Sequence, residues 1–421
     1  MFLDLDWTQL HADRPPVLLL GGLDLLRPLG FAAIPAIVAS PNPHEPTMMS
    51  RYCLGCYRLP PMDNRAAMAE ALLDAGRQLF DVLGRRVVLF YGNDDYLSLI
   101  YEFRDQLSRY FLFLLNEPEL AYALLEKPRF ELLARDHGLL APKALTWGDA
   151  SPNDLRRACG PVLVKPCVKV GWDDSTMHAR LFGPQGKARI FENGQAVIDD
   201  PLANQFRKHL AFQEFIPGGD AQLWSFHGFS DENSNLLAWF IGHKLRTFPR
   251  FTGMSSFLEL AHETELEALG RDIVARLQLK GVFKIDFKKD AHDGRFRILE
   301  INARFNLWHH MAARNGINLP QIAYDYLVHG IPPTSTSYGT RFRWLCMRLD
   351  FRAYLDLRAH GEIGMVSWIA SLIRTHKVYH LFSWADPLPW LLAGFNRAQS
   401  RARRGLHQAE NTVKRWLSTA S

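Results

Sequence analysis

The first 125 residues alternate between short apolar runs and amphipathic stretches. Residues 16–40 hold two apolar runs separated by a short helical segment, and a third apolar run covers residues 87–91. Amphipathic stretches over residues 65–83 and 97–107 fit the gaps between these runs. Short apolar runs that alternate with helical periodicity predict buried strands joined by helices. We therefore expect an open α/β domain with a parallel sheet over residues 1–125.

Strands predominate between residues 126 and 330. The pattern predicts a helix that begins at Lys127 and a second helix over residues 263–277. Strands are predicted over residues 161–166, 222–229, 235–246, 282–288 and 296–304. After residue 331 the chain is rich in Arg, Trp and Leu, and we expect helices there that pack on the rest of the protein. The predicted domains are therefore 1–125, 126–330 and 331–421.

The last two predicted strands carry the most informative residues. Asp293-Gly294 lies between them, which predicts an antiparallel hairpin with a three-residue loop over residues 292–294. In that register Asp286 lies directly opposite Glu300. Because the side chains of a strand alternate between its two faces, Asn302 shares a face with both carboxylates.

This hairpin face predicts a metal site. Two opposed carboxylates repel each other unless a cation lies between them or one is protonated. Asp286, Glu300 and the amide oxygen of Asn302 are hard ligands that suit Mg²⁺, with Mn²⁺ as an alternative. Arg304, on the same face, has the fork geometry that holds a phosphate or a carboxylate. The alternative is a solvated charged face without a ligand.

Residues 284–287 (KIDF) and 300–304 (EINAR) resemble the metal-binding signature of the ATP-grasp superfamily, and in particular that of the predicted ATP-dependent carboxylate–amine ligases of bacteria. The resemblance implies an ATP-grasp fold of mixed α/β and α+β type. Its ATP-grasp domain would consist of two lobes with a hinge near residues 213–220. An N-terminal open parallel pre-ATP-grasp domain would precede it, and a helical C-terminal region would follow.

The resemblance also implies which residues hold the nucleotide. Lys127 and Lys165 match the two phosphate-binding lysines, and point charges of this kind keep phosphates from repelling each other. Lys169 lies in the stretch 167–175, where many ATP-grasp enzymes have a glycine-rich phosphate loop. This stretch contains only Gly171, so we expect Lys169 to replace some of the backbone contacts.

The resemblance also implies which segments bind the adenine base and the reacting carboxylate. The hinge strand that holds adenine matches residues Gln213, Glu214, Phe215 and Ile216. Asp220 would accept a ribose hydroxyl, or else serve as a turn residue after two glycines. Lys244 and Arg246 are expected to share one strand face and to point into one cleft. Arg246 would then stabilise an acyl-phosphate and the tetrahedral oxyanion that follows it.

The implied function is an ATP- and Mg²⁺-dependent ligase that activates a carboxylate as an acyl-phosphate, releases ADP and phosphate, and joins the acyl group to an amine or a thiol. Small-molecule carboxylates and amines would be its partners. Two alternatives keep the nucleotide site. One is a small-molecule kinase, and the other is a non-catalytic nucleotide-binding module recruited through its basic C-terminal region.

Composition adds limits on compartment and partners. The chain has 421 residues with 49 Lys and Arg against 44 Asp and Glu, a net charge of +5 that is too small to indicate nucleic-acid binding. Five cysteines do not form a disulfide framework, and no apolar stretch is long enough to span a bilayer, so we expect a cytoplasmic protein. Basic residues and tryptophans near the C-terminus leave contact with a membrane surface as an alternative to a solvated helix face.

Overall fold

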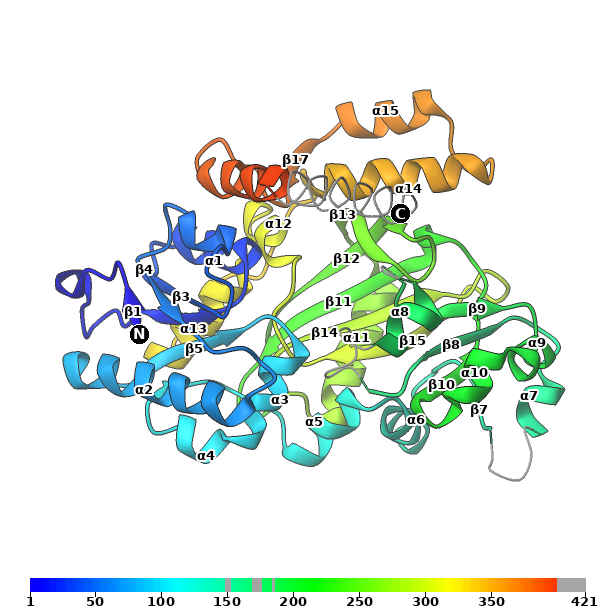
Figure 1. Cartoon of the computed structure of the whole chain (residues 1–421), viewed down its shortest axis with the longest axis horizontal. Coiled ribbons are helices and arrows are strands. Elements are labelled where there is room, and N and C mark those ends of the chain that lie inside the picture. Colours follow the sequence, from blue (N-terminus) through cyan, green and yellow to red (C-terminus); the bar gives the residue numbers. More distant parts are fainter. Residues whose placement is uncertain (148–152, 169–175, 184–185, 400–421) are drawn as a thin grey trace, which may run out of the picture.

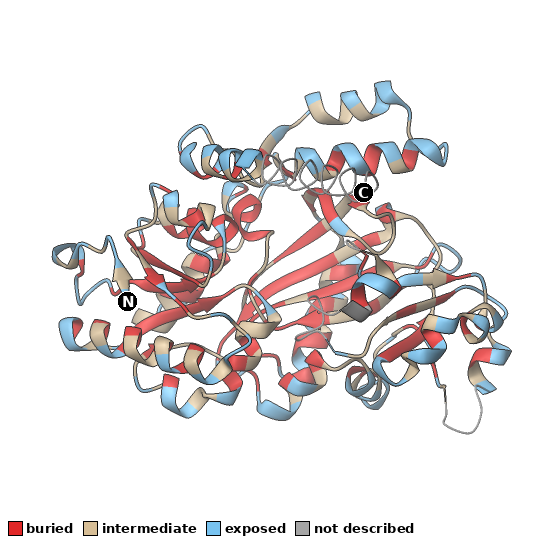
Figure 2. Cartoon of the chain, in the orientation of Figure 1, coloured by how far each residue is buried: buried red, intermediate tan, exposed pale blue. Residues whose placement is uncertain are grey.

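The computed structural model describes residues 1–147, 153–168, 176–183 and 186–399. Lys169, most of the stretch 167–175 and the basic residues beyond position 400 lie outside the described residues, so the expectations placed on them stay predictions. Within the described part of the chain, the strands form three sheets (Figure 1). The interior strands of these sheets are buried along most of their length (Figure 2).

The N-terminal sheet has the strand order β1-β4-β3-β2-β5-β6. The strands are β1 (Phe2–Leu3), β2 (Val17–Leu20), β3 (Ala36–Ser40), β4 (Gly55–Arg58), β5 (Val87–Tyr91) and β6 (Phe111–Leu112). All neighbours are parallel except β1 and β4. The helices are α1 (Leu23–Phe31), α2 (Arg65–Leu83), α3 (Asp94–Glu102), α4 (Arg104–Leu107) and α5 (Pro118–Leu125). This is the open parallel α/β arrangement that the alternating pattern predicts.

A small antiparallel sheet with the order β7-β10-β8-β9 lies at the opposite end of the molecule (Figure 1). Its strands are β7 (Ala144–Leu145), β8 (Val162–Pro166), β9 (Arg189–Phe191) and β10 (Leu210–Glu214). The accompanying helices are α6 (Lys127–Asp136), α7 (Asn153–Arg157), α8 (Thr176–Phe182), α9 (Gly194–Asp199) and α10 (Pro201–Gln205). Its apolar core is separate from those of the rest of the protein and includes Val164, Val197 and Phe212.

The largest sheet has the order β15-β14-β11-β12-β13-β16-β17. Its strands are β11 (Leu223–Ser230), β12 (Leu236–Phe248), β13 (Met254–Ala261), β14 (Gly281–Lys289), β15 (Phe296–Asn302), β16 (Phe342–Leu345) and β17 (His376–Tyr379). Helix α11 (Thr264–Leu277) packs on one face, where Leu266 and Ile273 join Phe226 and Ile285 in one core. Helices α12 (His309–Arg314) and α13 (Leu319–His329) lie between the sheet and α1.

The region after residue 331 contains the expected helices, α14 (Met347–Ala359) and α15 (Met365–Ile373), and residues 388–399 are also helical. It also supplies β16 and β17 to the largest sheet, which the pattern does not predict. A buried ion pair between Arg27 and Asp386 ties the region to α1, with 3.0 Å between Nε and Oδ2. The boundaries of the three predicted domains stay predictions.

The β14–β15 hairpin differs from its predicted form at the turn. The strands are joined by six residues, 290–295, and the prediction of a three-residue loop is wrong. Gly294 does have the left-handed φ expected of it, at 72°. A β-bulge next to Asp286 shifts the register by one residue, and beyond it Asp286 lies opposite Glu300. The bulge therefore restores the predicted pairing at the end of the hairpin that carries the acids.

Candidate active site

Asp286 and Glu300 come together on adjacent strands, and Asn302 bridges them. The Asn302 amide donates from Nδ2 to Oδ2 of Asp286 at 3.3 Å and to Oε1 of Glu300 at 3.1 Å. Asp286 is only 4% exposed, and its buried Oδ1 accepts no hydrogen bond from the described residues. The predicted oxygen donors thus lie within reach of one another, and Oδ1 of Asp286 accepts no hydrogen bond although Lys244 lies 3.5 Å from it.

Lysine ammonium groups surround these carboxylates. Lys284 lies 2.6 Å and Lys244 3.5 Å from the two oxygens of Asp286, and Lys127 lies 3.5 Å from Oε2 of Glu300. Lys284 is absent from the predicted site, although its position two residues before Asp286 places it on the same strand face. Burial lowers the pKa of Lys284, and the neighbouring Asp286 carboxylate opposes that shift.

The donor set fits a hard divalent cation. Carboxylate oxygens and an amide oxygen are the protein ligands that Mg²⁺ prefers, and the orphaned Oδ1 of Asp286 offers a buried negative end for it. For Asn302 to act as a ligand, its amide must turn so that Oδ1 replaces Nδ2 at the carboxylates. No group of three or more His, Cys, Asp or Glu side chains suited to a metal occurs among the described residues, and the predicted set has only two carboxylates.

Arg304 reaches the N-terminal domain. Its guanidinium forms a fork with Asp94, the first residue of α3, with Nε 2.9 Å from Oδ1 and Nη2 2.9 Å from Oδ2. Burial alone would lower the pKa of Arg304, but the carboxylates of Asp94, Glu300 and Asp286 together raise it. The fork that was predicted to hold a phosphate or a carboxylate is therefore engaged by a side chain of the protein.

Lys127 and Lys165 both lie close enough to Glu131 to act on its carboxylate. Lys127 is the first residue of α6, as predicted, and Lys165 lies on β8. Both lysines act on Glu131 of α6, where burial raises the carboxyl pKa and the two ammonium groups oppose the shift. Two chain segments thus direct positive charge to one place, as binding of phosphates requires.

The predicted adenine segment ends β10 and enters the connection to the large sheet. Gln213 is buried, and Ile216 is buried in the connection. The N–H of Glu214 donates to the carbonyl of Lys143, and the N–H of Phe215 to that of Pro161, each at 2.9 Å. These two N–H groups are engaged within the protein and are not available to a base.

Asp220 is a structural residue rather than a free acceptor. Its Oδ2 accepts from the N–H and the hydroxyl of Thr247, at 2.7 and 2.9 Å, and its Oδ1 accepts from the N–H of Phe251 at 2.9 Å. The carboxylate is 7% exposed and holds the turn between β12 and β13. The expectation that Asp220 accepts a ribose hydroxyl does not agree with this geometry, whereas its alternative as a turn residue does.

Arg246 does not share a cleft with Lys244, contrary to the expectation from strand alternation. The β12–β13 pairing shifts on both sides of Arg246, so that Lys244 pairs with Leu258 and Arg246 with the adjacent Phe257. Leu258 and Phe257 are successive residues of β13 and therefore point to opposite faces of the sheet. A side chain shares the face of the residue that it pairs with on the next strand, so Lys244 and Arg246 lie on opposite faces. Arg246 instead binds Asp350 of α14 through Nε and Nη2, at 2.8 and 2.9 Å.

The pattern also did not predict a buried polar pair, Ser225 and His227, on the same sheet face as Asp286. The Oγ of Ser225 lies 2.9 Å from Nε2 of His227, which pairs across the sheet with Lys284.

His309 is fully buried, and neither of its ring nitrogens forms a hydrogen bond with the described residues. Burial lowers the pKa of His309 to about 3, so this imidazole is neutral. Trp308, its neighbour, packs against Gly242.

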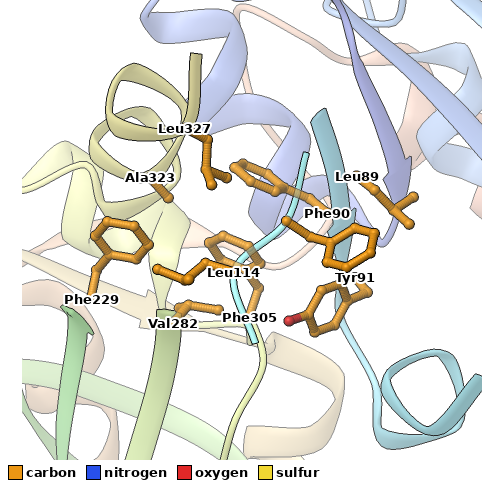
Figure 3. Close-up of a pocket in the computed structure, with 10 residues that line it drawn as sticks. Leu89, Phe90, Tyr91, Leu114, Phe229, Val282, Phe305, Ala323 and Leu327 are labelled. Atoms are coloured by element: carbon orange, nitrogen blue, oxygen red, sulfur yellow. The ribbon is translucent and has the colours of Figure 1, made fainter. Parts of the chain in front are cut away.

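An apolar cavity lies between the N-terminal sheet and the large sheet but offers no chemistry. Figure 3 shows Phe90 and Tyr91 of β5 facing Phe305, Val282 and Phe229 across it. Helix α13 closes one side of the cavity. A lining made almost entirely of carbon fits a packed domain junction rather than a substrate site.

Comparison with known proteins places this geometry in a familiar fold. A family model described as "ATP-grasp in the biosynthetic pathway with Ter operon" matches residues 235–346, which include the whole β14–β15 hairpin. A D-aspartate ligase of Enterococcus faecium (strain Aus0004) is 22% identical over 292 residues, which cover 67% of this chain and 68% of that protein.

Solved structures agree. The biotin carboxylase domain of a Hydrogenobacter thermophilus 2-oxoglutarate carboxylase, crystallised with MgADP, ADP and bicarbonate, superposes with a TM-score of 0.57 and 14% identity over 78% of this chain and 73% of its own. An L-amino acid ligase of Bacillus licheniformis superposes with a TM-score of 0.53 and 15% identity over 76% of this chain and 74% of its own. The chain therefore has the ATP-grasp fold, and the predicted resemblance is confirmed.

Proposed function

We propose that this protein is an ATP- and Mg²⁺-dependent ligase that joins a carboxylate to an amine through an acyl-phosphate. The observation that supports this proposal most directly is the opposed pair Asp286 and Glu300, bridged by Asn302 and surrounded by lysines. The ATP-grasp fold and the D-aspartate ligase relative support the same reaction class. Amino acids are accordingly the first carboxylates and amines to test.

In the first step, a carboxylate oxygen of the substrate attacks the γ-phosphorus of ATP, and the bond to the β–γ bridging oxygen breaks to release ADP. Lys127 and Lys165 hold the phosphates from the small lobe, and Lys244 approaches from the large sheet. Asp286, Glu300 and Asn302 would hold Mg²⁺, which supplies charge neutralisation at the phosphates when bound.

In the second step, the amine nitrogen attacks the acyl carbon, the carbon–oxygen bond to phosphate breaks, and the nitrogen loses a proton. Lys284 is placed to stabilise negative charge on the tetrahedral intermediate, since it lies at the centre of the acidic face. Arg246 takes no part in this scheme because it is buried against Asp350. Arg304 acts as a positioning residue that ties the metal strand to the N-terminal domain through Asp94.

The test is a product analysis with purified full-length protein, ATP, Mg²⁺ and pairs of amino acids that include D-aspartate. We expect equimolar ADP, free phosphate and a new amide. Glu300→Ala should abolish turnover, and Glu119→Ala, an exposed acid on α5, is the matched control. Release of AMP and pyrophosphate would contradict the proposal.

The same assay separates the alternatives. A thiol in place of the amine would give a thioester with the same ADP and phosphate. A small-molecule kinase would give ADP without free phosphate, because the phosphoryl group stays on the product. A non-catalytic module would bind Mg-ATP and produce no ADP with any acceptor.

A further inference from the structure

Lys288 is a buried cation without a counter-ion. It is the penultimate residue of β14 and is only 4% exposed. Among the described residues, its ammonium group forms no hydrogen bond and no ion pair. Lysine is almost never fully buried unless it is paired, because removing the charge from water costs several kcal/mol. A ligand that accepts a hydrogen bond would remove this anomaly.

The nearby carboxylates do not serve this purpose. Asp220 and Asp290 are the acids that act electrostatically on Lys288. Asp220 already accepts three hydrogen bonds from the turn between β12 and β13. Asp290 accepts from the N–H of His292 at 2.9 Å and from Arg297 at 3.4 Å. Both acids are committed to holding loops, so neither is the missing partner.

Two aromatic rings frame the ammonium group instead. The Nζ of Lys288 lies 4.1 Å from the ring centre of Phe215 and 5.7 Å from that of Phe251. The two rings lie 5.8 Å apart, edge to face. Phe215 belongs to the segment proposed to hold the base, and Phe251 lies in the turn that Asp220 fixes. The hinge, this turn and β14 therefore converge on Lys288.

Lys288 also shares a strand face with Asp286. The β11–β14 pairing is regular, with Ser225 opposite Asp286 and Leu223 opposite Lys288. Two residues along a strand correspond to about 7 Å, so Lys288 is displaced from the metal ligands toward the hinge. A nucleotide whose phosphates lie at Asp286 would direct its base to this side.

We infer that the ammonium group of Lys288 donates a hydrogen bond to a ring nitrogen of the purine base, so that Lys288 determines base specificity. The inference rests on the proposed ATP site and adds a residue that the hinge segment alone does not supply. The rings of Phe215 and Phe251 offer flat apolar surfaces for the base, and the ammonium group supplies the directional contact.

The experiment measures binding of ATP and of 1-deaza-, 3-deaza- and 7-deaza-ATP to the full chain with Mg²⁺ by titration calorimetry. Wild-type protein should bind one of the three analogues about tenfold or more weakly than ATP, since each analogue lacks one ring nitrogen and a hydrogen bond to a charged donor is lost. Lys288→Met should weaken ATP binding by a similar factor and should show no further loss with that analogue. Lys289→Met, a change to the neighbouring lysine on the opposite strand face, should behave as wild type.

Equal binding of ATP and all three analogues by wild-type protein would overturn the inference and leave the proposed function standing. An unchanged penalty for the analogue in Lys288→Met would overturn it as well, because the lysine would then act without contacting the base. If wild-type protein bound no Mg-ATP, the proposed function itself would fail. The wild-type series requires no folded variant, so a destabilised Lys288→Met protein would not prevent a decision.

Discussion

Removal of the charge of Asp350 should destabilise the protein strongly. Asp350 is fully buried and accepts from Nε and Nη2 of Arg246, from Oγ of Ser256 at 3.0 Å and from Nε1 of Trp368 at 2.9 Å. Breaking a buried ion pair by changing one partner costs about 3–5 kcal/mol, because the other charge stays buried without compensation. We expect Asp350→Asn to lower the free energy of unfolding by an amount in this range.

The assay is urea unfolding followed by tryptophan fluorescence. Trp368 of α15 stacks on Tyr354 of α14, with 4.6 Å between ring centres, so it is one of the eleven tryptophans whose emission changes when the protein unfolds. Arg246→Met should destabilise the protein to a similar degree. The double variant Arg246→Met/Asp350→Asn should lose less than the sum of the single changes, since no charge remains buried.

The same variants decide the role of Arg246. If it is structural, Arg246→Met protein that remains folded at low temperature should retain ligase turnover. Normal stability combined with complete loss of turnover would refute this reasoning and restore the catalytic role that the family resemblance implied. Full additivity of the two single changes would also contradict it, because residues in direct contact are expected to couple.

Further predictions concern other parts of the molecule. The pKa of His309 is lowered to about 3, so between pH 6.5 and 3 only the unfolded state binds a proton at this residue. The free energy of unfolding should therefore fall by about 1 kcal/mol for each unit by which the pH is lowered in this range. His309→Phe should reduce this dependence of the free energy of unfolding on pH. Asp94→Asn should leave Arg304 buried without its partner and lower the free energy of unfolding by about 1–3 kcal/mol, measured by urea unfolding; no change would contradict a structural fork. If the C-terminal region contacts membranes, the protein should float with anionic vesicles, and Val366→Asp, at a position 79% exposed on α15, should weaken flotation, while absence of flotation would exclude this contact.

No helix among the described residues is long and apolar enough to cross a bilayer.

Local pattern was sufficient for much of the fold and for the centre of the site. Strand alternation and an Asp-Gly turn predicted that Asp286 and Glu300 face each other, and the position of Lys127 at the start of a helix followed from helical periodicity. Both features depend on residues near one another in sequence. The parallel sheet of the N-terminal domain followed from the order of strands and helices, because alternating elements favour a parallel sheet, whereas the ATP-grasp fold followed from the resemblance of the acidic hairpin to a known signature.

The pattern was insufficient wherever a strand departs from regular pairing. The shifts around Arg246 turn its side chain away from Lys244, and an isolated sequence carries no mark of such a bulge. The strand pairing predicted next to the hairpin turn is one residue out of register, and the bulge beside Asp286 restores the predicted pairing of Asp286 with Glu300.

The sequence by itself determined the alternation of strands and helices in the N-terminal domain and the acidic hairpin, because both arise from periodicities of two and 3.6 residues that act over short distances. Only the tertiary structure decided which charges are satisfied within the protein. Asp94 and Arg304 are 210 positions apart and Arg246 and Asp350 are 104 apart, and their pairing depends on how whole elements pack. The same packing leaves Lys288 buried beside two aromatic rings, a property that no window of sequence contains.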